Sequence, residues 1–208
     1  MATLQGSLFD ALLDSAAGIG RLEPQRTELE HGAWVDHQLA WLHGSDTVFD
    51  VLESAAPWRA ERRQMYERLV DVPRLVSWFG ADDALPHPAL DDAKRALSAH
   101  YRRDEPQGFT TAGMCLYRDG RDSVAWHGDT IGRGRHEDTL VAIVSLGAPR
   151  ALLLRPRGGG SSHRFMLGHG DLLVMGGSCQ RTWEHAVPKT SKPQGPRISV
   201  QFRPPGVR

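Results

Sequence analysis

The chain has 208 residues, and its 25 basic side chains balance 25 acidic ones, so the formal net charge is zero. This length predicts one domain with a sizeable core, and the balanced charge excludes a global basic field, so nucleic-acid binding would need a local patch. Two cysteines are too few for a disulfide framework and indicate a reducing, cytoplasmic setting, and the sequence predicts neither a signal peptide nor a membrane span.

The first half of the chain predicts an extension followed by helices. Residues 1–28 are expected to form an N-terminal extension, in which "SLFDALL" could be a short amphipathic turn packed on the body. Apolar spacing predicts a short helix over 45–55. The middle of 57–80 could also be helical, although its proline and its "SWFG" segment favour an extended exit. A longer helix is predicted over 88–102, because Pro88 suits a first turn and the apolar residues share one face.

After residue 108 the pattern changes to strands. Short apolar runs alternate with glycine, proline or polar turns, which is typical of an all-β barrel or sandwich. The runs are "FTTAGMCLY", "TLVAIVSL", "RALLLR", "HRFML", "DLLVMGG", "RTWEHAV" and "RISVQFR". Helices are disfavoured here because the runs are short and glycines interrupt them.

Three residues of this region are candidate metal ligands. His127 and Asp129 belong to "WHGD" at a predicted strand end, and residues two apart on a strand project from the same face. His185, in the distant "TWEHAV", can close a facial triad with open positions for substrate and O2, the ligand set of non-haem Fe(II) oxygenases. H-x-D alone is a weak signal because the chain has 10 histidines, so solvated loop residues remain the alternative.

The C-terminal strand "RISVQFR" carries two arginines on one face. Strand alternation places Arg197 and Arg203 together, with Ser199 and Gln201 between them. Burying two guanidinium groups requires anions, and a dicarboxylate supplies two that match the planar arginine fork. The alternative is that Arg203 caps the exposed end of the strand and that this polar face is simply wet.

These segments together resemble the AlkB family of Fe(II)/2-oxoglutarate dioxygenases. The resemblance rests on "CLYRDGRDSVAWHGD", "LVAIVSLGAPRALLLRPR", "GDLLVMGGSCQRTWEHAVPK" and "RISVQFR", in this order, and covers roughly residues 57–203. It implies an α+β, mainly β fold: a double-stranded β-helix, or jelly roll, with N-terminal helices packed on one side. It further implies a single dioxygenase domain over 29–208, with a nucleotide-recognition lid at about 57–88 and a jelly-roll core at about 108–205.

The resemblance also implies roles for particular residues. By position, His127, Asp129 and His185 match the iron ligands, which form the catalytic centre. Arg197 matches the arginine that holds the remote carboxylate of 2-oxoglutarate, with help from Tyr117, and Arg203 the one near the metal. The complete set expected to bind the co-substrate is Cys115, Leu116, Tyr117, Arg197, Ser199 and Arg203.

Two departures from the family pattern bear on the chemistry. The family usually has asparagine two residues before the tyrosine, where it bonds 2-oxoglutarate. Cys115 stands there in this chain and offers only a weak donor, so either co-substrate affinity falls or a neighbour substitutes. Many members also carry acidic residues just after H-x-D, one of which contacts the exocyclic amine of the base. Here Thr130 and Ile131 take their place, which puts the usual preference for methylated adenine or cytosine in doubt.

Four residues are predicted to contact the substrate. Trp78 and Tyr66 could stack a base, although a core position is the better expectation for each. Ile131 follows the ligand turn, and Arg157 follows the "ALLLR" strand. The arginines of "WRAERR", "YRDGR", "GRGRHE" and "LRPR" would give local basicity if they surround one mouth, whereas ordinary solvated surface is the alternative.

The function implied is oxidative dealkylation of N-alkylated nucleobases in DNA or RNA, as in alkylation-damage repair, with Fe(II), 2-oxoglutarate and O2. A base inside a duplex cannot reach such a pocket, so it must be flipped or already single-stranded. The alternatives are a 2-oxoglutarate-dependent hydroxylase of a protein or small molecule, and a non-catalytic reader of modified nucleic acid. A monomer is the expected assembly, and Cys179 is expected to be a packed thiol.

Overall fold

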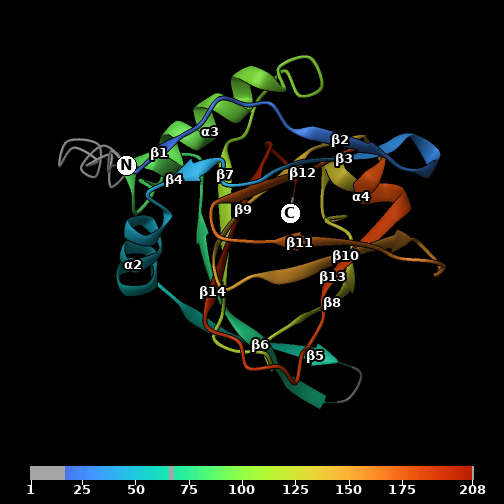
Figure 1. The fold of residues 1–208 in the computed structure, drawn as a ribbon. Helices are drawn as coiled ribbons and strands as arrows, with labels where there is room; N and C mark the ends of the chain where they lie inside the picture. Colours follow the sequence, from blue (N-terminus) through green and yellow to red (C-terminus); the bar gives the residue numbers. More distant parts are fainter. Residues whose placement is uncertain (1–16, 66–67, 208) are drawn as a thin grey trace, which may run out of the picture.

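The computed structural model describes residues 17–65 and 68–207. Within them, two antiparallel sheets face each other, and helices lie against the outer side of the larger one (Figure 1). The larger sheet has eight strands in the order β2-β3-β12-β9-β14-β7-β6-β5, and the smaller has four in the order β11-β10-β13-β8. This is the predicted jelly roll. In the described part of the chain, no helix is both long and apolar enough to cross a bilayer.

The elements have the following bounds. The larger sheet comprises β2 (Gln25–Glu28), β3 (Ala33–Gln38), β12 (Asp171–Gly177), β9 (Val141–Gly147), β14 (Arg197–Arg203), β7 (Thr111–Tyr117), β6 (Arg68–Phe79) and β5 (Arg59–Met65). The smaller comprises β11 (His163–Leu167), β10 (Arg150–Pro156), β13 (Trp183–Val187) and β8 (Val124–His127). The short strands β1 (Gly18–Ile19) and β4 (Leu42–His43) pair with each other. The helices are α2 (Ser45–Ala55), α3 (Pro88–His100) and α4 (Cys179–Thr182), with 3-10 turns η1 (Glu30–Gly32) and η2 (Arg133–Arg135).

The larger sheet separates two apolar cores. Its outer face packs against α2 and α3, which bury Val48, Leu52, Leu90 and Leu97 there. The space between the two sheets holds a second cluster, which includes Val35, Ile143, Leu152, Leu154, Leu173 and Met175. Removal of these side chains from water is the main favourable contribution to folding, and it makes the larger sheet a rigid wall between the helices and the pocket.

Strand β14 shows how the sequence divides between these two sides. Ile198, Val200 and Phe202 are fully buried in the helix-side cluster. The residues between them, Arg197, Ser199, Gln201 and Arg203, line a pocket between the sheets. The strict alternation of side chains along a strand therefore places every polar residue of "RISVQFR" on the pocket side, as predicted.

Most of the predicted elements are confirmed. The short helix occupies Ser45–Ala55, and the longer one begins at Pro88 and ends at His100 rather than at residue 102. The longer helix is capped by His87, whose Nδ1 accepts the Ala89 backbone N–H at 3.1 Å. Each of the seven apolar runs after residue 108 contains a strand.

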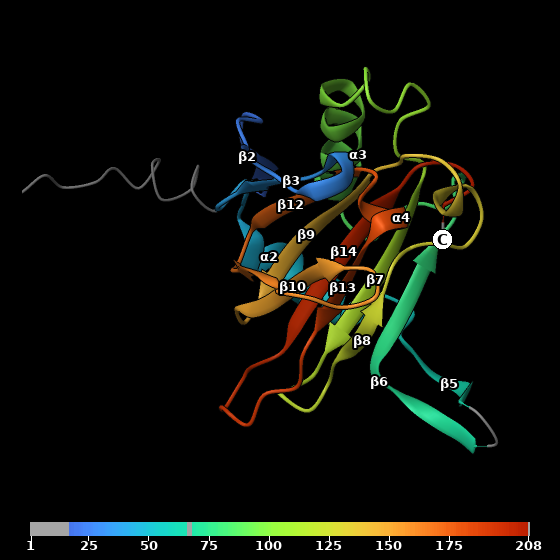
Figure 2. The same cartoon turned by 90° about the vertical axis from the view of Figure 1, so that its right-hand side faces the viewer.

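The expectation that the middle of 57–80 could be helical is wrong. The segment forms the β5–β6 hairpin, which extends the larger sheet from β7 and projects from the body (Figure 2). "RAERRQM" is rich in good helix formers, but intrinsic propensity is a weak preference that tertiary pairing overrides. The pairing of β6 with β7, from Leu75 opposite Leu116 to Phe79 opposite Ala112, fixes the hairpin as sheet.

Four strands near the N-terminus, β1 to β4, have no counterpart in the sequence prediction. β3 pairs with β12, and β2, which falls within the predicted extension 1–28, pairs with β3. In β3, four consecutive residues from Ala33 are buried. The apolar run of β3 is cut short by Asp36, which is buried in an ion pair with Arg26, so the sequence shows neither alternation nor a continuous apolar run. The predicted turn in "SLFDALL" lies outside the described residues.

Candidate metal centre

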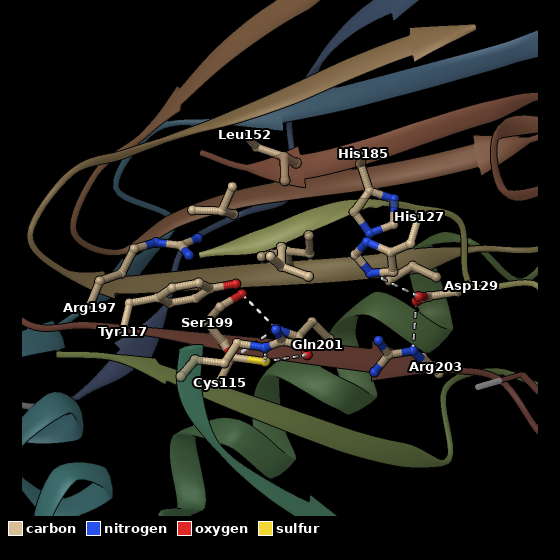
Figure 3. A pocket seen from close by; sticks show the side chains of 15 residues that line it. Cys115, Tyr117, His127, Asp129, Leu152, His185, Arg197, Ser199, Gln201 and Arg203 are labelled. Atoms are coloured by element: carbon tan, nitrogen blue, oxygen red, sulfur yellow. Dashed lines mark hydrogen bonds and ion pairs between the residues drawn. The ribbon is translucent and has the colours of Figure 1, made fainter. Parts of the chain in front are cut away.

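Two neighbouring strands of the smaller sheet bring the three predicted metal ligands together. β8 ends at His127, and Asp129 follows in the turn after it. β13 pairs with β8 so that His185 lies directly opposite His127. One ligand atom from each of the three residues lies within 4.8 Å of the others (Figure 3). Two imidazoles and a carboxylate that converge in this way fit a divalent first-row metal with open coordination positions, such as Fe(II).

The orientation of His127 suits coordination through Nε2. Nδ1 of His127 lies 2.9 Å from the Ala125 carbonyl oxygen, so the proton sits on Nδ1 and Nε2 is left to the centre. Nε2 of His127 is 3.8 Å from Oδ1 of Asp129. The rings of His127 and His185 lie side by side, with centroids 4.2 Å apart. A backbone carbonyl that fixes the tautomer of a ligating histidine is a common supporting contact at metal sites.

The protonation states also suit metal binding. Burial and, to a lesser extent, the neighbouring His127 lower the pKa of His185 to about 3, so the imidazole is neutral at pH 7. Burial by itself raises the pKa of the Asp129 carboxyl, but Arg203 and the two histidines outweigh it and lower that pKa to about 2. The centre therefore offers a neutral imidazole and a carboxylate at neutral pH, the forms that coordinate metals.

Arg203 holds the ligand carboxylate. Its Nε donates to Oδ2 of Asp129 at 2.8 Å, which leaves Oδ1 directed toward His127. The predicted alternative, that Arg203 merely caps the exposed end of its strand, is wrong, because its side chain is 12% exposed and ion-paired within the pocket.

Arg197 lies at the other end of the same pocket, beside Tyr117 (Figure 3). The residue is 1% exposed, and its Nε donates to Oγ of Ser145 at 2.9 Å. Its Nη1 has no hydrogen-bond partner among the described residues. A buried guanidinium in this state requires an anion, and a dicarboxylate that reaches from the metal ligands to Arg197 supplies one.

Between these two ends, β7, β14 and β6 present polar side chains. Cys115, Ser199 and Gln201 line the pocket as strand alternation predicts. Arg74 also lines it, which the sequence analysis missed: its Nε lies 3.3 Å from Sγ of Cys115, and its Nη1 lies 3.3 Å from the Ser123 carbonyl oxygen. The signal for Arg74 was the alternation of β6, which puts it on the same face as Trp78.

One residue of the predicted co-substrate set does not belong to the pocket. The side chain of Leu116 lies on the opposite face of the larger sheet, buried in the cluster that packs against the helices. Because it is flanked by the pocket residues Cys115 and Tyr117, the alternation of β7 turns it away. Including Leu116 in the co-substrate set was therefore wrong as far as its side chain is concerned.

The four predicted substrate contacts differ in exposure and in their contacts within the protein. Trp78 is 45% exposed beside Arg203, whose guanidinium carbon lies 6.0 Å from the indole centroid, so the core position weighed for it is wrong. Ile131 is 68% exposed after the ligand turn. Arg157 donates to the backbone carbonyls of Arg181 and Gln180 at 3.0 and 3.2 Å, so its contact with substrate stays a prediction. Tyr66 lies outside the described residues.

Several arginines expected to make a basic mouth are paired with carboxylates of the chain itself. The pairs are Arg118 with Asp122, Arg121 with Asp119, Arg133 with Glu105, and Arg155 with Glu184. A paired guanidinium adds no net positive charge to its surroundings. Cys179 is the packed thiol that was predicted: it is 2% exposed, and burial raises its pKa to about 12.

Comparison with known proteins agrees with this geometry. The sequence pattern of one family, the 2OG-Fe(II) oxygenase superfamily, matches residues 57–203. The alpha-ketoglutarate-dependent dioxygenase alkB homolog 3 of Bos taurus is 29% identical over 181 residues, 78% of this chain and 62% of the relative. The DNA oxidative demethylase ALKBH2 of Arabidopsis thaliana is 28% identical over 192 residues, 76% of this chain and 61% of the relative. The matches thus span less than two thirds of the length of these relatives.

The fold has a counterpart among solved structures. The structure of OsALKBH1 superposes with a TM-score of 0.61 at 13% sequence identity, covering 86% of this chain and 100% of that one, which shows a shared fold. By its family match, the chain belongs to the 2OG-Fe(II) oxygenase superfamily. Within that class it is a member of the AlkB family, as the four sequence segments indicated. Membership confirms the predicted cofactors: Fe(II), 2-oxoglutarate and O2.

Proposed function

We propose that this dioxygenase oxidatively dealkylates N-alkylated nucleobases in DNA or RNA. The observation that carries the proposal is the convergence of His127, Asp129 and His185 at one end of a pocket whose other end holds the buried guanidinium of Arg197. Nη1 of that guanidinium has no hydrogen-bond partner among the described residues. The names of the relatives, which include DNA oxidative demethylases, support the choice of substrate.

The chain's own residues would bind and orient the reactants. We assign His127, Asp129 and His185 to the metal, and Arg197 with Tyr117 to the remote carboxylate of 2-oxoglutarate. Fe(II), with 2-oxoglutarate and O2, supplies the power to hydroxylate the alkyl carbon next to nitrogen. The hydroxylated group then leaves as an aldehyde and restores the base. The pocket between the sheets holds the reacting groups in place and shields them from bulk water.

Trp78 is well placed to receive the base. Its ring packs over Gly113, where a Cβ would lie 3.4 Å from the ring and 2.8 Å from Nη1 of Arg203. The exposed part of the indole therefore sits next to the side chain that holds Asp129. Stacking on an aromatic face is sequence-tolerant and worth roughly 1–3 kcal/mol per base, which offsets part of the few kcal/mol needed to flip a base.

Arg74 is the neighbour that substitutes for the family asparagine. A guanidinium donates charge-assisted hydrogen bonds to a carboxylate, whereas the thiol of Cys115 is a weak donor. Arg74 reaches the pocket alongside Cys115 from β6. We assign it to the co-substrate, as a third cation beside Arg197 and Arg203.

The test is mass spectrometry of a panel of N-methylated DNA and RNA oligonucleotides after incubation with protein, Fe(II), ascorbate and 2-oxoglutarate. We expect loss of the methyl group from at least one base, dependent on 2-oxoglutarate, and none with the Asp129→Ala variant. Succinate formed with a protein or small-molecule acceptor, but with no oligonucleotide, would overturn the nucleobase assignment while keeping the dioxygenase.

A further inference from the structure

The turn that carries two of the proposed metal ligands is held from outside by α4. This helix has four residues and lies directly before β13, the strand of His185. The backbone N–H of Asp129 donates to Oε1 of Gln180 at 2.9 Å, and Gln180 is 1% exposed. The other end of the Gln180 amide lies 3.9 Å from Sδ of Met175, a weak acceptor. The contact of the amide oxygen with Asp129 therefore fixes the side chain.

A second set of contacts joins the same two segments. The guanidinium of Arg157 donates to the carbonyls of Gln180 and Arg181. It also lies against Gly128, between the two ligands, where a Cβ would be 2.8 Å from Nη2 of Arg157 and 2.7 Å from the Gln180 carbonyl oxygen. Only glycine permits the turn to approach α4 this closely.

The helix is itself anchored to the body of the fold. Ser178, which precedes it, donates its hydroxyl to the His31 carbonyl oxygen at 2.7 Å. Trp183, which follows it, donates its indole N–H to the Glu30 carbonyl oxygen at 3.1 Å. An ion pair between Arg181 and Asp138 ties it to the far end of the loop that follows the ligand turn. α4 (Cys179–Thr182) is thus held in place between the two segments that carry the proposed ligands, and this anchored helix with Arg157 is called the bracket below.

We propose that Gln180 is a positioning residue for Asp129, which it holds in the ligand geometry through the hydrogen bond to the Asp129 backbone. Arg157 adds a second link, because its guanidinium joins the backbone of Gln180 and lies against Gly128. The inference rests on the proposed metal-ligand role of Asp129. Partners of this kind at metal sites typically change metal affinity by about 10–100-fold when they are removed.

The test uses the full chain, anaerobically, with Co(II) titrated in the presence of 2-oxoglutarate and followed by its visible absorption. Gln180→Met keeps the length of the side chain and removes the acceptor, and we expect it to weaken Co(II) binding at least about tenfold. Gln180→Glu keeps an acceptor oxygen and should bind Co(II) more tightly than Gln180→Met. Cys179→Ala, on the same buried helix, is the matched control and should bind as the unaltered protein does.

The outcomes separate the two proposals. If the unaltered chain and Asp129→Ala bind Co(II) equally, Asp129 is not a metal ligand, and the positioning role of Gln180 is overturned as well. If Asp129→Ala fails to bind but Gln180→Met binds within twofold of the unaltered chain, the bracket alone is wrong. Equal weakening in the Met and Glu variants would also overturn it, because packing and not the hydrogen bond would then be the cause. Thermal melting of each variant without metal shows that it is folded.

Discussion

Arg197 is a buried cation that its protein partners satisfy only in part. Its Nε has the hydroxyl of Ser145, but its Nη1 has no partner among the described residues. An incompletely paired buried charge destabilises the fold, and its replacement by an apolar side chain of similar size is often neutral or stabilising. Such a residue makes sense where binding of an anion, rather than stability, determines its identity.

We therefore predict opposite effects of Arg197→Met on stability and binding. The melting temperature of the ligand-free protein should stay the same or rise. Affinity for 2-oxoglutarate should fall by about 10–100-fold, the loss of one charge-assisted contact of roughly 1.5–3 kcal/mol. Thermal melting with and without 2-oxoglutarate and Mn(II) measures both. A variant that melts lower on its own and keeps the full ligand-induced shift would contradict the assignment.

A double mutant can test whether Arg74 performs the role that the family asparagine has at the position of Cys115. Arg74→Leu should weaken 2-oxoglutarate binding about tenfold, because the remaining thiol is a weak donor. Adding Cys115→Asn, which introduces the amide usual in the family, should recover most of that loss. The measurement is anaerobic titration of the charge-transfer band with Fe(II). Equal affinities of Arg74→Leu and the unaltered protein would show that Arg74 does not bind the co-substrate.

The residues that could be predicted lie in recognisable sequence segments. The ligand triad and the two arginines of β14 could be predicted because four sequence segments, in order, resemble the AlkB family, whereas the spacing alone left solvated alternatives open. Gln180 could not, because nothing in "GGSCQRT" distinguishes it from an ordinary turn residue, and because it acts through the backbone of a residue far away in the sequence. The error at Leu116 was avoidable, since alternation along β7 excludes it.

At the scale of elements, the contact of β3 with β12 depends on a glycine. A Cβ at Gly176 would lie 2.1 Å from Cζ2 of Trp34, which is 7% exposed and packed in the core. Trp34 stacks on Tyr101, which follows α3, with ring centroids 5.9 Å apart. The guanidinium carbon of Arg26 lies over the Trp34 ring, 3.6 Å from its centroid. The indole therefore has little room to move.

We predict that Gly176→Ala destabilises the protein by about 1–3 kcal/mol, the range of overpacked cores. Gly18→Ala is the matched control: Gly18 also lies in a strand, and its added Cβ meets nothing within 4 Å. Urea unfolding of both variants gives the comparison. Similar midpoints for the two would mean that Trp34 rearranges at no cost and that the β3–β12 contact is looser than the structure indicates.

The elements that the sequence predicted are those with a recognisable local pattern. β7, β9 and β14 have apolar runs bounded by turn residues, and α2 and α3 each have one apolar stripe. The β5–β6 hairpin was missed because its composition favours a helix, and β3 was missed because Asp36, His37 and Gln38 interrupt its apolar run. In both cases the strand is determined by its partner, β7 or β12, and the pairing of distant segments is not encoded in local periodicity.

At the scale of the whole molecule, the neutral charge limits how nucleic acid can bind. The formal net charge is zero, and several loop arginines are already paired with carboxylates. The β5–β6 hairpin contributes the exposed Arg59 near one edge of the larger sheet. Binding should therefore depend on a few phosphate contacts together with stacking of the base, rather than on a broad basic surface.

The salt dependence of binding tests this. For single strands, the logarithm of the binding constant falls with the logarithm of salt concentration by about 0.7 per phosphate contacted. With two or three such contacts, affinity for a methylated single-stranded oligonucleotide should fall only about tenfold between about 50 and 200 mM salt, as measured by fluorescence anisotropy. Arg59→Ala should lower the slope by about 0.7, and Arg121→Ala, whose guanidinium is held by Asp119, should leave it unchanged. A slope that requires six or more contacts would mean that the ion pairs open when nucleic acid binds, and the paired arginines would then belong to the binding surface.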